Sequence, residues 1–202
     1  MEIWIATGNK GKLEEFKLGL KPLFASQQDV QIFSQSDLKT FTPMPENGDS
    51  FVANARIKAK SLKAMKPNCW IIADDSGLEV HGLGNLPGIH SARYAGPHAR
   101  DSENVAKLLK MMLIRNVNPR TAHFKCVLVI YSPSGEEFIY EGELKGTISS
   151  KPSGLMGFGY DPVFVPEGET KTLADLGPGY KIQKSHRAVA LDKFIQQFTQ
   201  HS

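Results

Sequence analysis

The chain has 202 residues, enough for one large domain with a sizeable hydrophobic core. Hydrophobic residues make up 41% of it and charged residues 22%, which is typical of a globular protein and excludes a disordered, collagen-like or coiled-coil chain. The formal net charge of +3 is too small for the concentrated basic face of a duplex-binding protein, so we expect no nucleic-acid partner.

The N-terminus and the cysteines indicate the cellular compartment. Met1–Ala6 lacks the basic start and the long apolar stretch of a signal peptide, and the longest apolar run, Cys126–Tyr131, is too short to span a bilayer. Cys69 and Cys126 form no CxxC pair, which favours two buried thiols over a disulfide or a metal site. We therefore expect a cytoplasmic protein with no membrane partner.

The N-terminal part alternates short apolar runs with amphipathic segments. Ile3–Ala6 predicts a buried strand that ends in a glycine loop, and Leu13, Phe16 and Leu20 then lie at helical spacing. The elements predicted next are a strand at Val30–Phe33, a loop at Phe41–Asp49, a helix at Ser50–Met65 and a strand at Trp70–Ala73.

The second half predicts further strands and two helices. Strands that first alternate with helices and then form a hairpin indicate an α/β protein with a mixed β-sheet. We expect a single domain over residues 1–202, in its simplest form bilobed with a central cleft. The predicted elements are an irregular segment at Gly82–Pro97, a helix at Asp101–Arg115, strands at Ala122–Tyr131 and Glu137–Glu141, a glycine-rich loop at Ser153–Gly159, a strand at Val163–Val165 and a last helix from near Ser185 to Phe198.

The first glycine loop is a candidate anion site. Glycines let the backbone approach a ligand, and the N–H groups at a helix N-terminus favour an anion. The loop is not a Walker A motif, because Ala6 stands at the first glycine position and Leu13 follows the GK pair. A phosphate-binding loop and a plain turn with solvated lysines both remain open. The segment consists of Thr7, Gly8, Asn9, Lys10, Gly11 and Lys12.

Two adjacent carboxylates, Asp74 and Asp75, follow the predicted strand at Trp70–Ala73. Ligands of open α/β sheets bind beyond the carboxyl ends of strands, and Mg²⁺ prefers carboxylate oxygens. A magnesium site is therefore favoured over a turn with capping aspartates. Glu46, in a predicted loop, becomes a candidate third carboxylate only if it lies near this pair.

Two later segments carry aromatic and basic candidates. Glycines flank Phe158 and Tyr160, so these rings are either presented to a purine base or part of the core. Lys181 and Arg187 are candidate contacts for phosphates or a base carbonyl. His186 alone is more typical of a structural or solvent-facing position.

Together these segments resemble the inosine triphosphate pyrophosphatase family, in particular the bacterial-type non-canonical purine NTP pyrophosphatases. The match rests on ATGNKGKLEEF, FVANARIKA, IADDSGLEV, PGIHSARYAG, FGYDPVF and SHRAVAL, which extend over nearly the whole chain. The resemblance implies an elongated mixed sheet with flanking helices, two lobes around a central substrate cleft, and a homodimer. It also implies Mg²⁺-dependent hydrolysis of dITP, ITP, XTP and dXTP to the monophosphate and pyrophosphate.

The resemblance also implies a set of site residues. Asp75 matches the catalytic acid/base position, with Asp74 close by, and Asp75 and Glu46 match the metal ligands. The implied substrate-binding residues are Thr7, Gly8, Asn9, Lys10, Gly11 and Lys12 for phosphates, Ser76, then Phe158, Gly159, Tyr160 and Asp161 for the nucleoside, and Lys181, His186 and Arg187 for the remaining base and phosphate contacts.

The chain departs from the family pattern at two places. Pro45-Glu46 replaces a pair of glutamates, and Ala53 replaces the glutamate of a Glu-Asn-Ala triplet. These departures weaken the assignment of Glu46 to a metal and leave open a nucleotide sensor that does not hydrolyse its ligand. A pyrophosphatase for modified pyrimidine nucleotides is a further alternative.

A mechanism consistent with these residues needs charge neutralisation and a positioned water rather than a covalent intermediate. Either Asp75 or Asp74 would accept the proton of the attacking water. Lys12, Lys181 and Arg187 would stabilise charge on the phosphates. Donors facing the six-carbonyl of hypoxanthine or xanthine would discriminate against adenine.

Overall fold

The computed structural model describes residues 1–26 and 30–200. In it the chain forms two compact units. Unit 1 comprises Met1–Asp75, Cys126–Gly142 and Arg187–Ser202, and unit 2 comprises Ser76–Lys125 and Glu143–His186. Among the described residues, no helix is long and apolar enough to cross a membrane.

The described part of the chain contains a seven-stranded sheet with the hydrogen-bonded order β2-β1-β3-β5-β6-β7, and β4 pairs with β3. β1 is parallel to β2 and β3, whereas β4 is antiparallel to β3 and β7 to β6. The predicted α/β class with a mixed sheet is therefore confirmed, while the single bilobed domain with a central cleft stays a prediction. The strands are β1 (Glu2–Ile5), β2 (Gln31–Ser34), β3 (Trp70–Val80), β4 (Leu86–Pro87), β5 (Thr121–Tyr131), β6 (Glu137–Ile148) and β7 (Phe164–Pro166).

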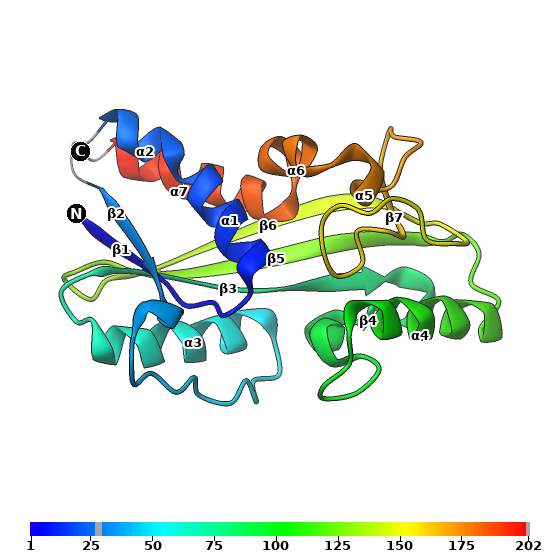
Figure 1. The fold of residues 1–202 in the computed structure, drawn as a ribbon, viewed down its shortest axis with the longest axis horizontal. Coiled ribbons are helices and arrows are strands. Elements are labelled where there is room, and N and C mark those ends of the chain that lie inside the picture. Colours follow the sequence, from blue (N-terminus) through cyan, green and yellow to red (C-terminus); the bar gives the residue numbers. More distant parts are fainter. Residues whose placement is uncertain (27–29, 201–202) are drawn as a thin grey trace. The chain divides into compact units, whose positions relative to one another are not determined.

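The long helices lie where the apolar periodicity predicts them (Figure 1). Asn9 caps α1 by accepting a hydrogen bond from the Lys12 backbone N–H at 3.0 Å, and Ser50 caps α3 by accepting from that of Ala53 at 3.3 Å. The helices are α1 (Lys10–Gly19), α2 (Lys21–Ser26), α3 (Phe51–Met65), α4 (Asp101–Ile114), α5 (Leu173–Leu176), α6 (Pro178–Lys184) and α7 (His186–Gln200), with 3₁₀ turns η1 (Gln35–Asp37), η2 (His81–Leu83) and η3 (Gly88–Arg93).

Unit 1 has helices on both faces of its strands: α1, α2 and α7 cover one face and α3 covers the other (Figure 1). Successive strand residues point to opposite faces, so the apolar runs of β1, β3 and β5 supply two cores at once. The first core contains Ile3, Ile5, Phe16, Leu20, Leu23, Ile72, Cys126, Leu128, Ile130, Ala190, Leu191 and Phe194. The second contains Trp4, Ala6, Ala55, Ala59, Leu62, Ile71, Ala73, Val129 and Tyr131.

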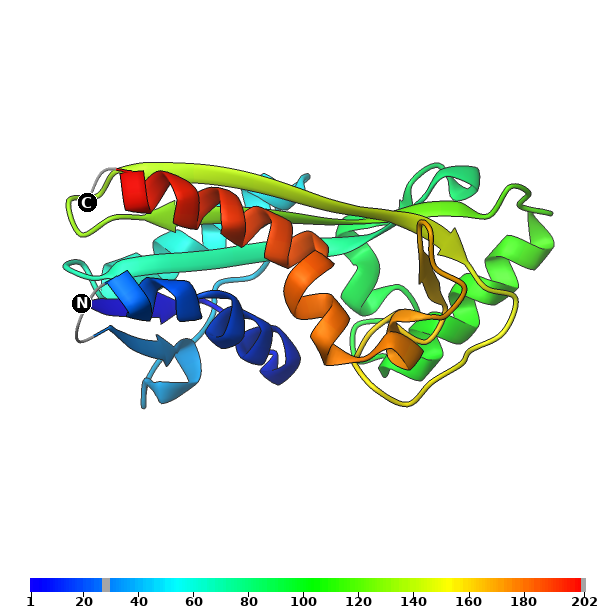
Figure 2. The same cartoon turned by 90° about the horizontal axis from the view of Figure 1, so that it is seen from above.

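Unit 2 has one core, which α4 shares with the strands of that unit (Figure 2 shows α4 in green). Val105, Leu108 and Met112 repeat at helical spacing and form the buried stripe of α4. They pack with Leu78, Val80, Val117, Ala122, Phe124, Ile148, Tyr160, Val163, Phe164 and Leu173.

The prediction that a strand ends at Ala73 is wrong, because β3 continues through the two aspartates to Val80. Ser76 and Gly77 resemble a turn, but Leu78 and Val80 are fully buried in the core of unit 2 and keep the chain extended. The parallel partner does end here, since the pairing of β1 with β3 stops at Ile5 opposite Ile72. The polar pair therefore lies in mid-strand, just beyond the end of β1.

Candidate active site

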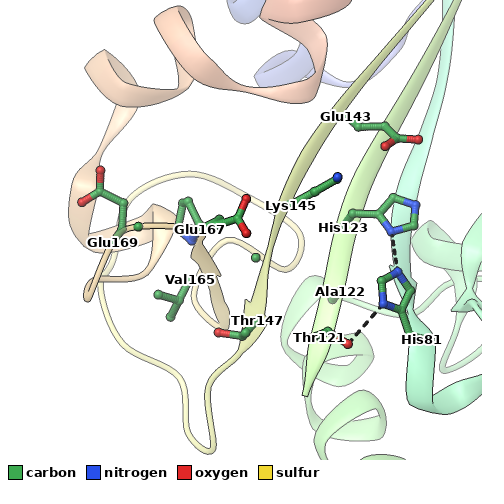
Figure 3. Close-up of a pocket in the computed structure, with 13 residues that line it drawn as sticks. His81, Thr121, Ala122, His123, Glu143, Lys145, Thr147, Val165, Glu167 and Glu169 are labelled. Atoms are coloured by element: carbon green, nitrogen blue, oxygen red, sulfur yellow. Dashed lines mark hydrogen bonds between the residues drawn. The ribbon is translucent and has the colours of Figure 1, made fainter. Parts of the chain in front are cut away.

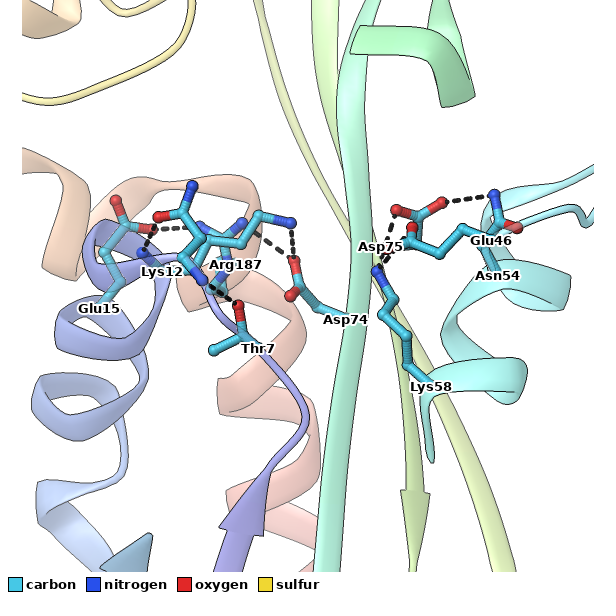
Figure 4. A network of polar contacts seen from close by, with 10 residues as sticks. Thr7, Lys12, Glu15, Glu46, Asn54, Lys58, Asp74, Asp75 and Arg187 are labelled. Atoms are coloured by element: carbon cyan, nitrogen blue, oxygen red, sulfur yellow. Dashed lines mark hydrogen bonds and ion pairs between the residues drawn. The ribbon is translucent and has the colours of Figure 1, made fainter. Parts of the chain in front are cut away.

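Asp74 and Asp75 lie on opposite faces of β3 in unit 1 (Figure 4). Adjacent residues of a strand alternate in direction, so the two carboxylates share a sequence position but not a chemical environment. Asp74 points to the side of α1 and α7, and Asp75 points to the side of α3. Each carboxylate forms a separate polar cluster.

The Asp74 cluster joins α1, β3 and α7. Oδ2 of Asp74 accepts from Nζ of Lys12 at 2.9 Å and from Nη2 of Arg187 at 3.1 Å. Nη1 of Arg187 also pairs with the Glu15 carboxylate. Asp74 and Arg187 are each 1% exposed, whereas the Lys12 side chain retains 17% exposure. Lys12 is therefore the cation of this cluster that reaches the surface.

Electrostatics keep Asp74 ionised. Burial alone would raise the pKa of Asp74, but the positive charges of Lys12 and Arg187 outweigh it and hold that pKa well below its ordinary value. Burial would likewise lower the pKa of Arg187, and the Asp74 and Glu15 carboxylates raise it instead. A carboxylate held as an anion by two cations accepts a proton poorly.

The Asp75 cluster joins β3, α3 and the loop before α3. Asn54 Nδ2 donates to Oδ2 of Asp75 at 3.1 Å, and Asn54 Oδ1 accepts from the Gly48 N–H at 2.9 Å. Lys58 Nζ lies 3.3 Å from Oδ1 of Asp75 and 3.1 Å from Oε2 of Glu46. One ammonium thus lies between two carboxylates, and a fully buried amide fixes one of them.

The surroundings of Asp75 raise its pKa, whereas those of Asp74 lower the pKa of that residue. Burial is the main effect on Asp75 and raises its pKa. The positive charges of Lys58 and Lys12 oppose this shift, but the net pKa of Asp75 remains above its ordinary value. Burial would lower the pKa of Lys58, yet the surrounding carboxylates raise it, so Lys58 stays charged.

The loop before α1 is shaped by its own side chains. The Thr7 hydroxyl accepts from the Asn9 N–H at 3.1 Å, and Asn9 caps the helix. Gly8, Asn9 and Lys10 are exposed, so the first turn of α1, whose N–H groups lack partners within the helix, borders solvent. Lys12 is the residue of this loop that contacts another predicted site residue, Asp74.

A second group of predicted residues meets in unit 2. Asp161, 2% exposed, accepts from Lys181 Nζ at 2.7 Å and from the Phe158 N–H at 2.9 Å. The Lys181 ammonium lies 4.1 Å from the centroid of the Phe158 ring. The Gly159 N–H donates to Asp101 Oδ2 at 2.7 Å. The loop is therefore held from its backbone, and Phe158 remains half-buried.

The remaining candidates of unit 2 are mainly packed against protein. Tyr160 belongs to the core, and its hydroxyl donates to the Ser91 carbonyl at 2.9 Å. The His186 ring is 5% exposed and stacks on Phe124 with centroids 4.8 Å apart. Ser76 follows Asp75 in β3 and is half-buried. The sequence left open whether the Phe158 and Tyr160 rings face a purine base or belong to the core, and Tyr160 belongs to the core.

Sequence reasoning missed three residues of the unit 1 clusters: Glu15, Asn54 and Lys58. Asn54 and Lys58 are four residues apart on α3 and therefore lie on one face. The available signal was Asn54, a polar residue beside the apolar stripe that contains Ala55 and Ala59. Glu15 and Lys58 look like ordinary solvated charges of amphipathic helices, and the sequence alone gives no signal for them.

Comparison with known proteins gives a consistent result. The model of the Ham1 family matches residues 3–197. A Bdellovibrio bacteriovorus protein named dITP/XTP pyrophosphatase is 60% identical over 196 residues, which cover 97% of this chain and 96% of that protein. A Bacillus subtilis protein with the same name is 40% identical and is covered to 94%, over 95% of this chain. The solved structure of a HAM1 protein from Coxiella burnetii has a TM-score of 0.87 at 33% identity, with 99% of each chain covered.

Proposed function

Because the chain belongs to the Ham1 family, we propose that it hydrolyses non-canonical purine nucleoside triphosphates to the monophosphate and pyrophosphate. The substrates are dITP, ITP, XTP and dXTP, and their hydrolysis removes them from the nucleotide pool. The family predicted from the sequence is confirmed. The near-complete coverage of the Bdellovibrio bacteriovorus relative supports the same activity over the same length of chain.

The structural observation that carries the proposal is the placement of Asp74 and Asp75 on opposite faces of β3. Phosphoanhydride hydrolysis requires both a base for water and cations for phosphate charge. Asp74 fixes cations in place, and Asp75 lies on the other face in a site where burial raises its pKa. The two requirements are thus met by neighbouring residues that do not compete.

Asp75 is the general base of this proposal. Burial raises the pKa of Asp75 toward neutral pH, and a general base is most effective when its pKa lies near the pH of the reaction. Asn54 donates a hydrogen bond to one oxygen of the Asp75 carboxylate, and Lys58 donates to the other. These two contacts fix the orientation of the carboxylate. Asp74 is instead a positioning residue for Lys12, whose ammonium contacts the phosphates, and for Arg187.

Asp75 and Glu46 fit a hard divalent cation. Their carboxylate oxygens approach the same Lys58 ammonium within 3.3 and 3.1 Å, so the pair already converges on one positive charge. We assign Mg²⁺ to these two residues, and Mg²⁺ bound there would offset the charge of the phosphates. Within the described residues no cluster of three or more His, Cys, Asp or Glu side chains forms a metal site, so substrate oxygens and water would complete the coordination.

The nucleoside part of the site is assigned to unit 2. Phe158 offers an aromatic ring to a purine, and the buried Asp161–Lys181 pair fixes the loop that carries it. Ser76 and Gly159, both half-buried, belong to the same proposal, and the buried Tyr160 and His186 would support the site from behind rather than contact the nucleoside. The segment Thr7–Lys12, in which Gly8, Asn9 and Lys10 are exposed, would bind phosphates. The homodimer and the cytoplasmic location stay predictions.

Pyrophosphate release from dITP, XTP, dATP and dGTP tests the function. We expect release from dITP and XTP with Mg²⁺, little from dATP and dGTP, and loss of release in Asp75→Asn. Asp192→Asn, which removes the same charge from an exposed position of α7, is the matched control and should keep the activity. Intact activity in Asp75→Asn would refute the assignment of the base, and no release from any purine would refute the function.

A further inference from the structure

Two histidines of unit 2 face each other outside the clusters described above (Figure 3). His81 begins η2, directly after β3, and His123 lies in β5. Nε2 of His81 and Nδ1 of His123 are 3.1 Å apart, and the ring centroids are 5.2 Å apart. One nitrogen of each ring thus points at the other ring.

The outer nitrogen of each ring has its own partner. His123 Nε2 lies 2.8 Å from Oε2 of Glu79, which accepts its N–H. His81 Nδ1 lies 3.1 Å from the Thr121 hydroxyl. Metal-binding histidines characteristically engage a carboxylate or another polar group through the nitrogen that does not bind the metal, which fixes the tautomer and the ring orientation. Both histidines have this arrangement here.

The separation of the inner nitrogens matches a shared metal ion. Two imidazole nitrogens at tetrahedral Zn²⁺, with Zn–N distances of about 2.05 Å, are about 3.3 Å apart. From this geometry we propose that His81 Nε2 and His123 Nδ1 bind a late first-row divalent cation, with Zn²⁺ as the representative ion. Imidazole nitrogen is a preferred ligand of these ions.

Metal binding requires only a change of tautomer in His81. With His123 Nε2–H donated to Glu79, a neutral pair has His81 Nε2–H donating to His123 Nδ1 and the Thr121 hydroxyl donating to His81 Nδ1. With metal, the His81 proton moves to Nδ1, where it is donated to the Thr121 oxygen, and both inner lone pairs face the ion. His123 keeps its Nε2–H on Glu79 in both states. No proton is gained or lost in this change of tautomer.

The surroundings favour a cation and leave room for its other ligands. The two histidines line a cavity of about 470 Å³ together with Glu143, Glu167 and Glu169, whose carboxylates outnumber the one lining ammonium, Lys145. No third His, Cys, Asp or Glu of the described residues joins the pair to make a larger metal-binding group, so water completes the coordination. The ion would link the end of β3 to the start of β5.

Zn²⁺ titration of the full-length protein, followed by the imidazole ¹⁵N shifts, tests the site. We expect the shifts of His81 Nε2 and His123 Nδ1 to change, while those of the exposed His98 do not. Shifts confined to other histidines, or no shifts at all, would overturn the proposal. This measurement uses the unaltered protein and does not depend on a variant that folds.

Calorimetry with Zn²⁺ alone supplies the quantitative test. Affinity should fall at least tenfold in His81→Gln and His123→Gln, and by about tenfold or more in Glu79→Gln, which removes the outer-shell carboxylate. His98→Gln is the matched control and should bind as the wild type does. Asp75→Asn should keep the Zn²⁺-binding component that His81→Gln loses, which separates this site from the carboxylates of the candidate active site. Loss of binding in Asp75→Asn with retention in His81→Gln would contradict the proposal.

Discussion

Replacing Asp74 by Asn should destabilise the protein strongly, because the substitution leaves two cations without their shared anion. Arg187 is the more costly of the two, since it is 1% exposed and cannot reach water. Removing one partner of a buried ion pair destabilises proteins by about 3–5 kcal/mol. Glu15 still pairs with Arg187, and Lys12 can rotate to the surface, so we expect about 3 kcal/mol.

Urea unfolding followed by circular dichroism measures this loss, and thermal unfolding should show a Tm lower by about 6–12 °C for a chain of this size. Asp192→Asn removes an exposed carboxylate and should change stability by no more than about 0.5 kcal/mol. If the loss of stability comes from the unpaired Arg187 guanidinium, the double variant Asp74→Asn/Arg187→Met should lose less stability than the sum of the losses in the two single variants. A single variant Asp74→Asn as stable as Asp192→Asn would refute the reasoning.

The Asp74 and Asp75 clusters should also affect the acid stability of the protein, the pH profile of its activity and its resistance to urea. Folding lowers the pKa of Asp74, so the carboxylate contributes its full stabilisation to the folded state above the unfolded pKa of about 3.9 and loses it as the pH falls further. The free energy of unfolding should therefore fall less steeply with acid in Asp74→Asn than in the wild type. Identical acid dependence of the two proteins would contradict this. Lys58→Met removes a charge that lowers the pKa of Asp75, so the acid limb of the kcat/KM profile should move to higher pH, and an unmoved limb would show that Asp75 is not the base. Asn54→Ala deletes the hydrogen bond to Asp75 and leaves the Gly48 N–H without its acceptor, which should cost about 1–3 kcal/mol in urea unfolding; a variant as stable as the wild type would show that neither contact contributes.

The sequence predicted the strands of the fold better than it predicted their ends. The apolar runs at Ile3–Ala6 and Ala122–Tyr131 identify β1 and β5 because strands buried on both faces read as continuous hydrophobic segments. β3 was predicted too short, since Asp74-Asp75-Ser76-Gly77 contains residues typical of turns. The tertiary packing of Leu78 and Val80 keeps the segment from Asp74 to Gly77 extended, and no local sequence pattern indicates this packing.

The candidate site was predictable where chemistry requires unusual residues and not where it uses ordinary ones. Adjacent carboxylates after an apolar run stand out in any sequence, so Asp74 and Asp75 were predicted as candidates. Lys58 was not, because a lysine on an amphipathic helix is usually solvated, and only the fold reveals that it lies between Glu46 and Asp75. The His81–His123 contact joins residues that are 42 positions apart, and nothing in either local segment indicates it.

The error in the length of β3 also explains why the sequence could not separate the roles of Asp74 and Asp75. In a loop the two carboxylates could turn toward the same ligand, and either could serve as the base. In an extended strand they must diverge, because adjacent side chains point to opposite faces. Asp74 is then committed to Lys12 and Arg187, and Asp75 alone shares the face of Glu46. The backbone conformation of two residues therefore decides which carboxylate lies on the face of Glu46, where we propose that it accepts the proton of the attacking water.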